Sequence, residues 1–192
     1  MRDSNPLKIL QNSLLGAPII WKGDYPYFIH PISDGIPRME AKVLRATRDI
    51  IVNSVDWDKI DLIVSVEAMG LPLLAAVGEK TGKPTVVIRK RTYGMEGEVR
   101  VDVSTGYSES TVYINDISSG ERILIVDDVI STGGTLEPIL QTLEDMGVIL
   151  QDIVIAIEKG EGKKRLAVEK PNWPIRTLVK IEIIDGKVGI IE

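Results

Sequence analysis

Two adjacent carboxylates and a run of small, hydroxyl-bearing residues stand together in one short segment. Asp127 and Asp128 follow four apolar residues, and residues 131–135 read Ser-Thr-Gly-Gly-Thr before a helical pattern begins. The backbone amides of such a loop, together with the positive end of a helix dipole, bind a phosphate, and glycines let the backbone come close. The carboxylates would repel a phosphate but suit neighbouring hydroxyl groups. The segment therefore predicts a site for one phosphate and a vicinal diol, as in a ribose 5-phosphate.

Two other interpretations of this segment compete with the ribose phosphate site. A lone Asp-Asp pair often marks a solvated turn before an ordinary helix, but here a strand, an acid pair and a hydroxyl-rich loop follow in order. A P-loop for nucleoside triphosphates is excluded, because no lysine follows the glycines at 133 and 134. The order of the features favours the ribose phosphate site.

The composition excludes several other kinds of site. The chain has 192 residues, of which 44% are hydrophobic, and this is enough for one domain with a buried core. It has no cysteine and a single histidine, His30, which excludes thiolate zinc sites and disfavours a histidine-rich metal site or a Ser-His-Asp triad. The net charge of −5 disfavours nucleic-acid binding. Without a membrane-length apolar run or a signal-peptide pattern, we expect a cytoplasmic protein that binds no membrane.

The elements that must position the segment alternate between strands and helices. Continuous apolar runs predict buried strands, and apolar residues three and four apart predict helices. The strands expected are residues 62–66, 85–88, 123–126, 153–157, 178–184 and 188–191, and the main helices are residues 37–55, 71–80 and 136–146. This pattern predicts an α/β fold with a parallel sheet and helices on both faces. Ligands of such sheets bind at the carboxyl ends of the strands, where the acid pair lies.

The segment from residue 123 to residue 135 resembles the phosphoribosyl pyrophosphate (PRPP) signature of the type I phosphoribosyltransferases. The resemblance extends from about residue 34 to the C-terminus. It implies a single domain, residues 1–192, with the parallel-sheet phosphoribosyltransferase type I fold and a small hood built from residues 1–36 and part of the C-terminus. It also implies that Asp127 and Asp128 are catalytic residues that contact the ribose hydroxyls. The residues implied to bind substrate beside them are Val129, Ile130, Ser131, Thr132, Gly133, Gly134 and Thr135.

A second loop resembles the pyrophosphate loop of adenine phosphoribosyltransferases. Glu67, Ala68, Met69 and Gly70 follow a predicted strand and are similar to the Glu-Ala-Arg-Gly sequence of those enzymes. Because Met69 replaces the arginine, backbone amides would have to hold pyrophosphate here. The alternative is an ordinary turn between a strand and a helix.

A basic run resembles the start of the flexible lid in the same enzymes. Arg89, Lys90 and Arg91 open a polar, glycine-bearing stretch, and cations beside a pyrophosphate make electrostatic sense. The alternative is a solvated basic loop. Hypoxanthine-guanine enzymes of the family often have a carboxylate at the position of Ser131 to handle a purine proton. That acid is missing here, and Glu96 and Glu98 in the lid are the candidates that remain.

Lys159 bears on the choice of base. It ends the strand after the signature helix and resembles the lysine with which 6-oxopurine enzymes bind O6. The alternative is a lysine at the protein surface with no role in binding. Lysine only donates hydrogen bonds, and hypoxanthine and guanine present an acceptor where adenine presents an amino group. The C-terminal hairpin resembles xanthine phosphoribosyltransferases and the loop at 67–70 resembles adenine enzymes. This mixture fits archaeal hypoxanthine/guanine phosphoribosyltransferases best.

The resemblance implies a purine salvage enzyme that converts PRPP and hypoxanthine or guanine to IMP or GMP and pyrophosphate. Mg²⁺ would be carried by PRPP and pyrophosphate, so no metal-ligating residues are expected. A homodimer follows by analogy with the family. The alternatives are an adenine or xanthine phosphoribosyltransferase and a PRPP-sensing regulator of purine transcription. Against the regulator, the first 36 residues are too short and too rich in Pro, Gly and aromatic residues for a DNA-binding domain.

Overall fold

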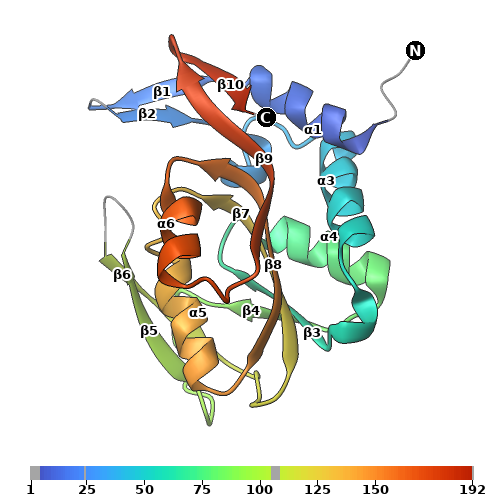
Figure 1. The fold of residues 1–192 in the computed structure, drawn as a ribbon, viewed down its shortest axis with the longest axis vertical. Helices are drawn as coiled ribbons and strands as arrows, with labels where there is room; N and C mark the ends of the chain where they lie inside the picture. The colour runs from blue at the N-terminus through green and yellow to red at the C-terminus, as the bar shows by residue number, and fades with distance from the viewer. Residues whose placement is uncertain (1–4, 24, 105–108, 192) are drawn as a thin grey trace.

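A six-stranded sheet lies at the centre of the computed structural model, which describes residues 5–23, 25–104 and 109–191 (Figure 1). The strand order is β10-β9-β8-β7-β3-β4, and all neighbouring strands are parallel except β9 and β10. The strands are β3 (Leu62–Val66), β4 (Thr85–Ile88), β7 (Arg122–Ile130), β8 (Ile149–Lys159), β9 (Ile175–Ile184) and β10 (Lys187–Ile191). The predicted α/β class with a mainly parallel sheet is confirmed.

Helices cover both faces of this sheet, which explains its continuous apolar strands. On one face, apolar side chains of α1, α2, α3 and α4 form a core with the sheet, and on the other face α5, α6 and the β5–β6 hairpin form a second core (Figure 1). The helices are α1 (Pro6–Leu15), α2 (Pro31–Asp34), α3 (Ala41–Ser54), α4 (Leu71–Thr81), α5 (Leu136–Asp145) and α6 (Gly162–Glu169), with a 3₁₀ turn at Trp57–Lys59. Within the described residues, none of the helices combines the length and apolar character needed to cross a membrane.

Two antiparallel hairpins lie outside the central sheet. They pair β1 (Ile19–Lys22) with β2 (Tyr25–Phe28), and β5 (Val99–Ser104) with β6 (Glu109–Ile114). The β1–β2 hairpin lies at the same end of the molecule as α1 and β10 (Figure 1). That these segments form a hood stays a prediction, and residues 1–4 and 24 of it lie outside the described residues.

The central strand is longer than its sequence pattern predicts. Residues 123–126 were expected to form the strand, but β7 continues through the acid pair to Ile130. The reason is its neighbour β8, whose length lets Asp127 pair with Ile155 and Ile130 pair with Glu158. The acid pair therefore has a backbone fixed by the sheet and does not lie on a loose turn.

Candidate active site

The predicted phosphate loop, residues 131–135, joins β7 to α5 at the carboxyl end of the central strand. Thr135 is the N-cap of α5, which has 10 residues. Within the loop, Gly134 N donates to Thr132 Oγ1 at 3.3 Å. The loop therefore presents backbone groups at the start of a helix, in the arrangement that binds phosphate.

The two glycines of this loop make room for neighbouring elements of the protein. A Cβ at Gly134 would overlap the carbonyl oxygen of Ser104, at the end of β5. Gly133 has φ of +83°, and a Cβ there would lie 3.0 Å from Leu166 Cδ1 in α6. The glycines let the β5–β6 hairpin and α6 pack against the loop. That they also allow the close approach of a phosphate stays a prediction.

Asp127 lies next to the predicted pyrophosphate loop. A Cβ built on Gly70 would lie 2.6 Å from Asp127 Oδ1 and would overlap the hydroxyl of Ser65. Ser65 is fully buried in β3, and its Oγ has no hydrogen-bond partner within the described residues. Because β3 and β7 are parallel neighbours, their ends bring the two predicted parts of the site together.

Burial raises the pKa of both carboxyl groups of the acid pair. The pKa of Asp127 rises to about 6 because the group is removed from water, while hydrogen bonds from Asp128 and the positive charge of Lys90 oppose the shift. The pKa of Asp128 rises well above its ordinary value because the negative charge of Asp127 adds to burial. The Asp128 backbone N donates to Asp127 Oδ1 at 3.0 Å. Carboxyl groups with perturbed pKa values mark candidate functional sites.

The carboxylate of Glu67 holds the predicted basic run. Glu67 Oε2 lies 3.0 Å from Arg89 Nε and accepts a hydrogen bond from Lys90 N at 3.0 Å. Lys90 is near enough to Asp127 to influence its pKa. The two loops that the sequence analysis singled out are therefore bound to each other at the acid pair.

The side chain of Met69 points from the predicted pyrophosphate loop toward Gly35. Met69 Cε lies 3.5 Å from the place where a Cβ on Gly35 would stand, just after α2. Ala68 is exposed and Gly70 is buried. That backbone amides of this loop hold pyrophosphate stays a prediction.

Arg91 and Glu98 have contacts of their own. Arg91 donates from Nε and Nη2 to the Tyr93 hydroxyl at 3.0 and 2.8 Å. Glu98 accepts hydrogen bonds from the Thr92 hydroxyl and from Tyr93 N, and these bonds lower the pKa of Glu98 to about 2. Glu98 thus orders the basic run through these hydrogen bonds.

Lys159 shares a cavity of about 680 Å³ with the start of the phosphate loop, Ser131 and Thr132. Lys159 Nζ donates to the Pro26 carbonyl at 2.6 Å and lies 5.7 Å from the centre of the Phe28 ring. Both contacts belong to the β1–β2 hairpin. Lys159 therefore spans from the end of β8 to this hairpin and is no solvated surface charge.

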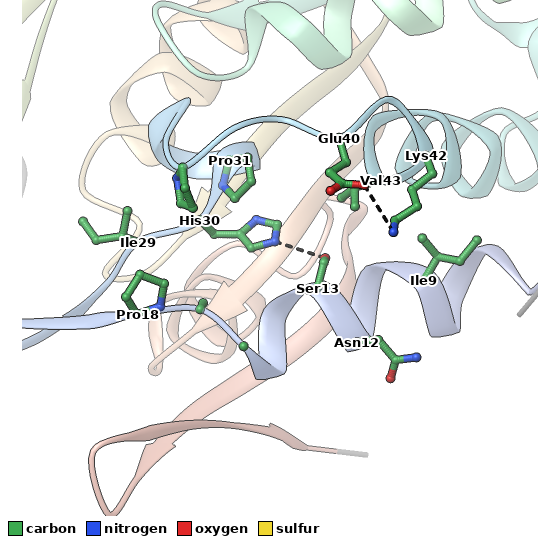
Figure 2. A pocket seen from close by; sticks show the side chains of 13 residues that line it. Ile9, Asn12, Ser13, Pro18, Ile29, His30, Pro31, Glu40, Lys42 and Val43 are labelled. Carbon is green, nitrogen blue, oxygen red and sulfur yellow. Dashed lines mark hydrogen bonds and ion pairs between the residues drawn. The ribbon is translucent and has the colours of Figure 1, made fainter. Parts of the chain in front are cut away.

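A larger cavity of about 840 Å³ contains none of the predicted ligand-binding residues; it lies beside α1, α2 and the start of α3 (Figure 2). His30 forms part of its wall, with Nε2 3.1 Å from Ser13 Oγ and Nδ1 accepting from Ile32 N at 3.2 Å. Burial lowers the pKa of His30 to about 4, although the charge of Asp34 opposes the shift. His30 is thus a neutral residue held by hydrogen bonds to α1 and α2.

Comparison with known proteins decides the family. The sequence matches the phosphoribosyl transferase domain family over residues 34–184. The chain belongs to the phosphoribosyltransferases. The hypoxanthine/guanine phosphoribosyltransferase of Methanotorris igneus is 48% identical over 183 residues, which cover 95% of this chain and 100% of that protein. The one from Aciduliprofundum boonei is 46% identical over 186 residues, with 97% and 100% covered.

Solved phosphoribosyltransferase structures have the same fold. The adenine phosphoribosyltransferase of Thermoanaerobacter pseudethanolicus superposes with a TM-score of 0.74 at 23% identity, covering 91% of this chain and 99% of that chain. The adenine enzyme of Trypanosoma brucei, solved with AMP, pyrophosphate and ribose-5-phosphate, has a TM-score of 0.74 at 21% identity, covering 94% and 81%. At these identities the structures establish the phosphoribosyltransferase fold and not the base that is used.

Three residues that the sequence analysis missed complete the surroundings of the site. Ser65 lies beside Asp127 and Gly70, while Gly162 and Arg165 of α6 contact the backbone of the phosphate loop. None of the three belongs to a recognisable motif, because each contacts residues that are distant along the chain. Within the described residues, no group of three or more His, Asp or Glu side chains forms a candidate metal site.

Proposed function

We propose that this protein transfers the phosphoribosyl group of PRPP to hypoxanthine and guanine in purine salvage. The observation that carries the proposal is that Lys159 and the start of the phosphate loop line one cavity of about 680 Å³, close to the end of β7 that bears the acid pair. Such a site can hold the phosphate and the base of one nucleotide. The archaeal relatives with this activity in their names, which are 45–48% identical over nearly the whole chain, support the choice of base.

The residues of the chain would bind and orient the substrates. Asp127 and Asp128 would accept hydrogen bonds from the ribose hydroxyls, and amides of residues 129–135 would hold the 5-phosphate. Backbone groups of residues 67–70, with Arg89, Lys90 and Arg91 nearby, would receive pyrophosphate as its bond to C1 breaks and the base nitrogen attacks. Orienting two substrates and excluding water is the main requirement of such a displacement. Lys159 would donate to O6 of the purine.

Mg²⁺ would enter as part of the PRPP substrate. It prefers hard oxygen ligands and keeps several waters, and phosphate oxygens supply them.

An assay with a panel of bases tests the function directly. The protein is incubated with PRPP, Mg²⁺ and each of hypoxanthine, guanine, xanthine and adenine, and nucleotide and pyrophosphate are measured. We expect IMP and GMP. Preferred formation of AMP or XMP would indicate the adenine or xanthine alternative. Binding of PRPP without any product would favour the transcription regulator.

The raised pKa of Asp127 predicts a pH dependence. A carboxylate accepts hydrogen bonds from ribose hydroxyls best when ionised, and Asp127 takes up a proton as the pH falls through about 6. We expect kcat/KM for PRPP to fall by up to about tenfold per pH unit below this pH. Because the phosphates of PRPP also titrate, Asp127→Asn is the control, and its profile should lack the step contributed by Asp127. Superimposable profiles would contradict the assignment.

Gly70→Ala should reduce kcat/KM for PRPP by about tenfold or more. Its methyl group would have to displace the Asp127 carboxylate or the Ser65 hydroxyl, and overpacking of this kind costs about 1–3 kcal/mol. The matched control is Gly16→Ala, whose Cβ would have no atom within 4 Å. Steady-state kinetics with both variants is the measurement, and equal activity would show that Gly70 does not support the acid pair.

We also propose a cytoplasmic homodimer. Support comes from the family and from exposed apolar side chains of the β1–β2 hairpin, Ile20 and Trp21. Light scattering on the purified protein would give the oligomeric state.

A further inference from the structure

We propose that α6 is a positioning element for the phosphate loop, and that Arg165 and Gly162 set the affinity for the 5-phosphate by orienting the loop's amides. The inference rests on the proposed function. It adds residues outside the PRPP signature to the substrate site.

The carbonyl groups of the loop are held by bonds to neighbouring elements. Ser131 O accepts from Gly162 N at 2.8 Å, and Thr132 O accepts from Arg165 Nη2 at 3.2 Å. The peptides that follow Ser131 and Thr132 are trans. In a trans peptide the carbonyl and the next amide point in opposite directions. Because both carbonyls face α6, the amides of Thr132 and Gly133 point away from α6.

Two successive amides on one side of a turn form a concave site for an anion. The bonds from α6 to the Ser131 and Thr132 carbonyls hold the two peptides in this direction. The packing leaves little freedom for a different orientation. A Cβ on Gly162 would overlap Ser131 O and lie 2.5 Å from the carbonyl carbon of Thr132. The start of α6 is therefore in direct contact with the loop backbone.

Arg165 links the loop to the helix that follows it. Its Nη2 also donates to Glu137 Oε2 in the first turn of α5 at 2.7 Å, and its Nη1 pairs with Glu169. The guanidinium thus joins the Thr132 carbonyl to α5 and offsets the charge of Glu137, which would otherwise weaken anion binding at this helix start. A single lysine nitrogen cannot make all of these contacts in the same geometry.

Calorimetry with two ligands tests the inference. Wild-type protein, Arg165→Met, Arg165→Lys and Gly162→Ala are each titrated with ribose 5-phosphate and, separately, with pyrophosphate and Mg²⁺. Loss of a hydrogen bond to a charged group predicts that Arg165→Met binds ribose 5-phosphate about tenfold more weakly or worse. Arg165→Lys should bind ribose 5-phosphate at least about threefold more weakly than the wild type, and Gly162→Ala at least about tenfold more weakly. Pyrophosphate affinity should stay within about twofold, because its loop is a separate unit at β3. Kinetically, KM for PRPP should rise while kcat changes little.

Matched controls separate this effect from a loss of stability. Arg176→Met breaks an ion pair with Asp152 at 2.6 Å, and Gly78→Ala places a Cβ 2.5 Å from Thr85 Cγ2, both away from the loop. We expect both controls to melt at lower temperature with unchanged affinity for ribose 5-phosphate.

Several outcomes would overturn the inference. One is unchanged affinity of Arg165→Met for ribose 5-phosphate, and another is an equal loss of affinity for both ligands. A third is wild-type affinity in Arg165→Lys, which would assign the effect to charge alone. A wild-type protein that bound neither ligand would overturn the proposed function together with this inference.

Discussion

Hypoxanthine should be used about 10²–10³-fold more efficiently than adenine, measured as kcat/KM for the base. A site built around a required hydrogen bond can reject an analogue that lacks it by as much as about 10⁴–10⁵. One lysine beside solvent should give less. With adenine, the Lys159 ammonium would face an amino group in place of the O6 acceptor. A wild-type enzyme that preferred adenine would contradict this expectation and would match the solved adenine enzymes that share its fold.

Lys159→Ala identifies the group responsible for this preference. The variant should raise KM for hypoxanthine by about tenfold or more and leave the affinity for PRPP near normal. The variant also loses the hydrogen bond from Lys159 to the Pro26 carbonyl, 2.6 Å long, which holds the β1–β2 hairpin. The control is Lys180→Ala, which removes a lysine paired with Glu158 at 3.3 Å on the neighbouring strand. If Lys159→Ala left hypoxanthine kinetics unchanged, Lys159 would be a support of the hairpin and not a reader of the base.

The second large effect should come from the acid pair. Asp127→Asn and Asp128→Asn should each lower kcat/KM for PRPP by about ten- to a hundredfold, because a hydrogen bond to a charged group contributes roughly 1.5–3 kcal/mol. Steady-state kinetics at saturating hypoxanthine is the measurement. Normal turnover in both variants would contradict the assignment of the pair to the ribose hydroxyls.

The same substitutions should stabilise the protein without substrate. A carboxyl group whose folded-state pKa is raised binds its proton more tightly in the folded state, so its contribution to stability is present at low pH and is lost as the pH rises through the folded-state pKa. Asparagine does not ionise, so the variant does not lose this stability as the pH rises. Partial exposure reduces the effect, and we expect a gain of about 1–2 kcal/mol at pH 8 for Asp127→Asn and a change in the same direction for Asp128→Asn. This corresponds to a rise in melting temperature of roughly 2–6 °C, with a smaller difference near pH 4.

A neighbouring aspartate gives the opposite control. Asp152 pairs with Arg176 at 2.6 Å, so Asp152→Asn should lower the melting temperature at neutral pH. Higher stability with lower activity is the signature of a residue retained for function. If Asp127→Asn and Asp128→Asn both destabilised the protein, the pair would instead serve the fold.

The sequence by itself determined the order of the elements and the motif that bears the chemistry. Apolar periodicity is local, so the strands at residues 62–66 and 85–88 were predicted with their observed bounds. Asp185 and Gly186 adopt positive φ angles of 50° and 70° in the β9–β10 turn, a conformation that an Asp-Gly pair favours. The acid pair and residues 131–135 were recognised because the residues that bind one small group lie close together along the chain.

Only the tertiary structure decided which distant residues complete that motif. The length of β7 depends on β8, and the raised pKa values of the acid pair depend on burial by neighbouring elements. The two loop glycines make room for α6 and the β5–β6 hairpin, and Arg165 reaches the Thr132 carbonyl from 33 residues away. Such contacts leave no local pattern, because packing and hydrogen bonding depend on distance in space, while a sequence pattern records only distance along the chain.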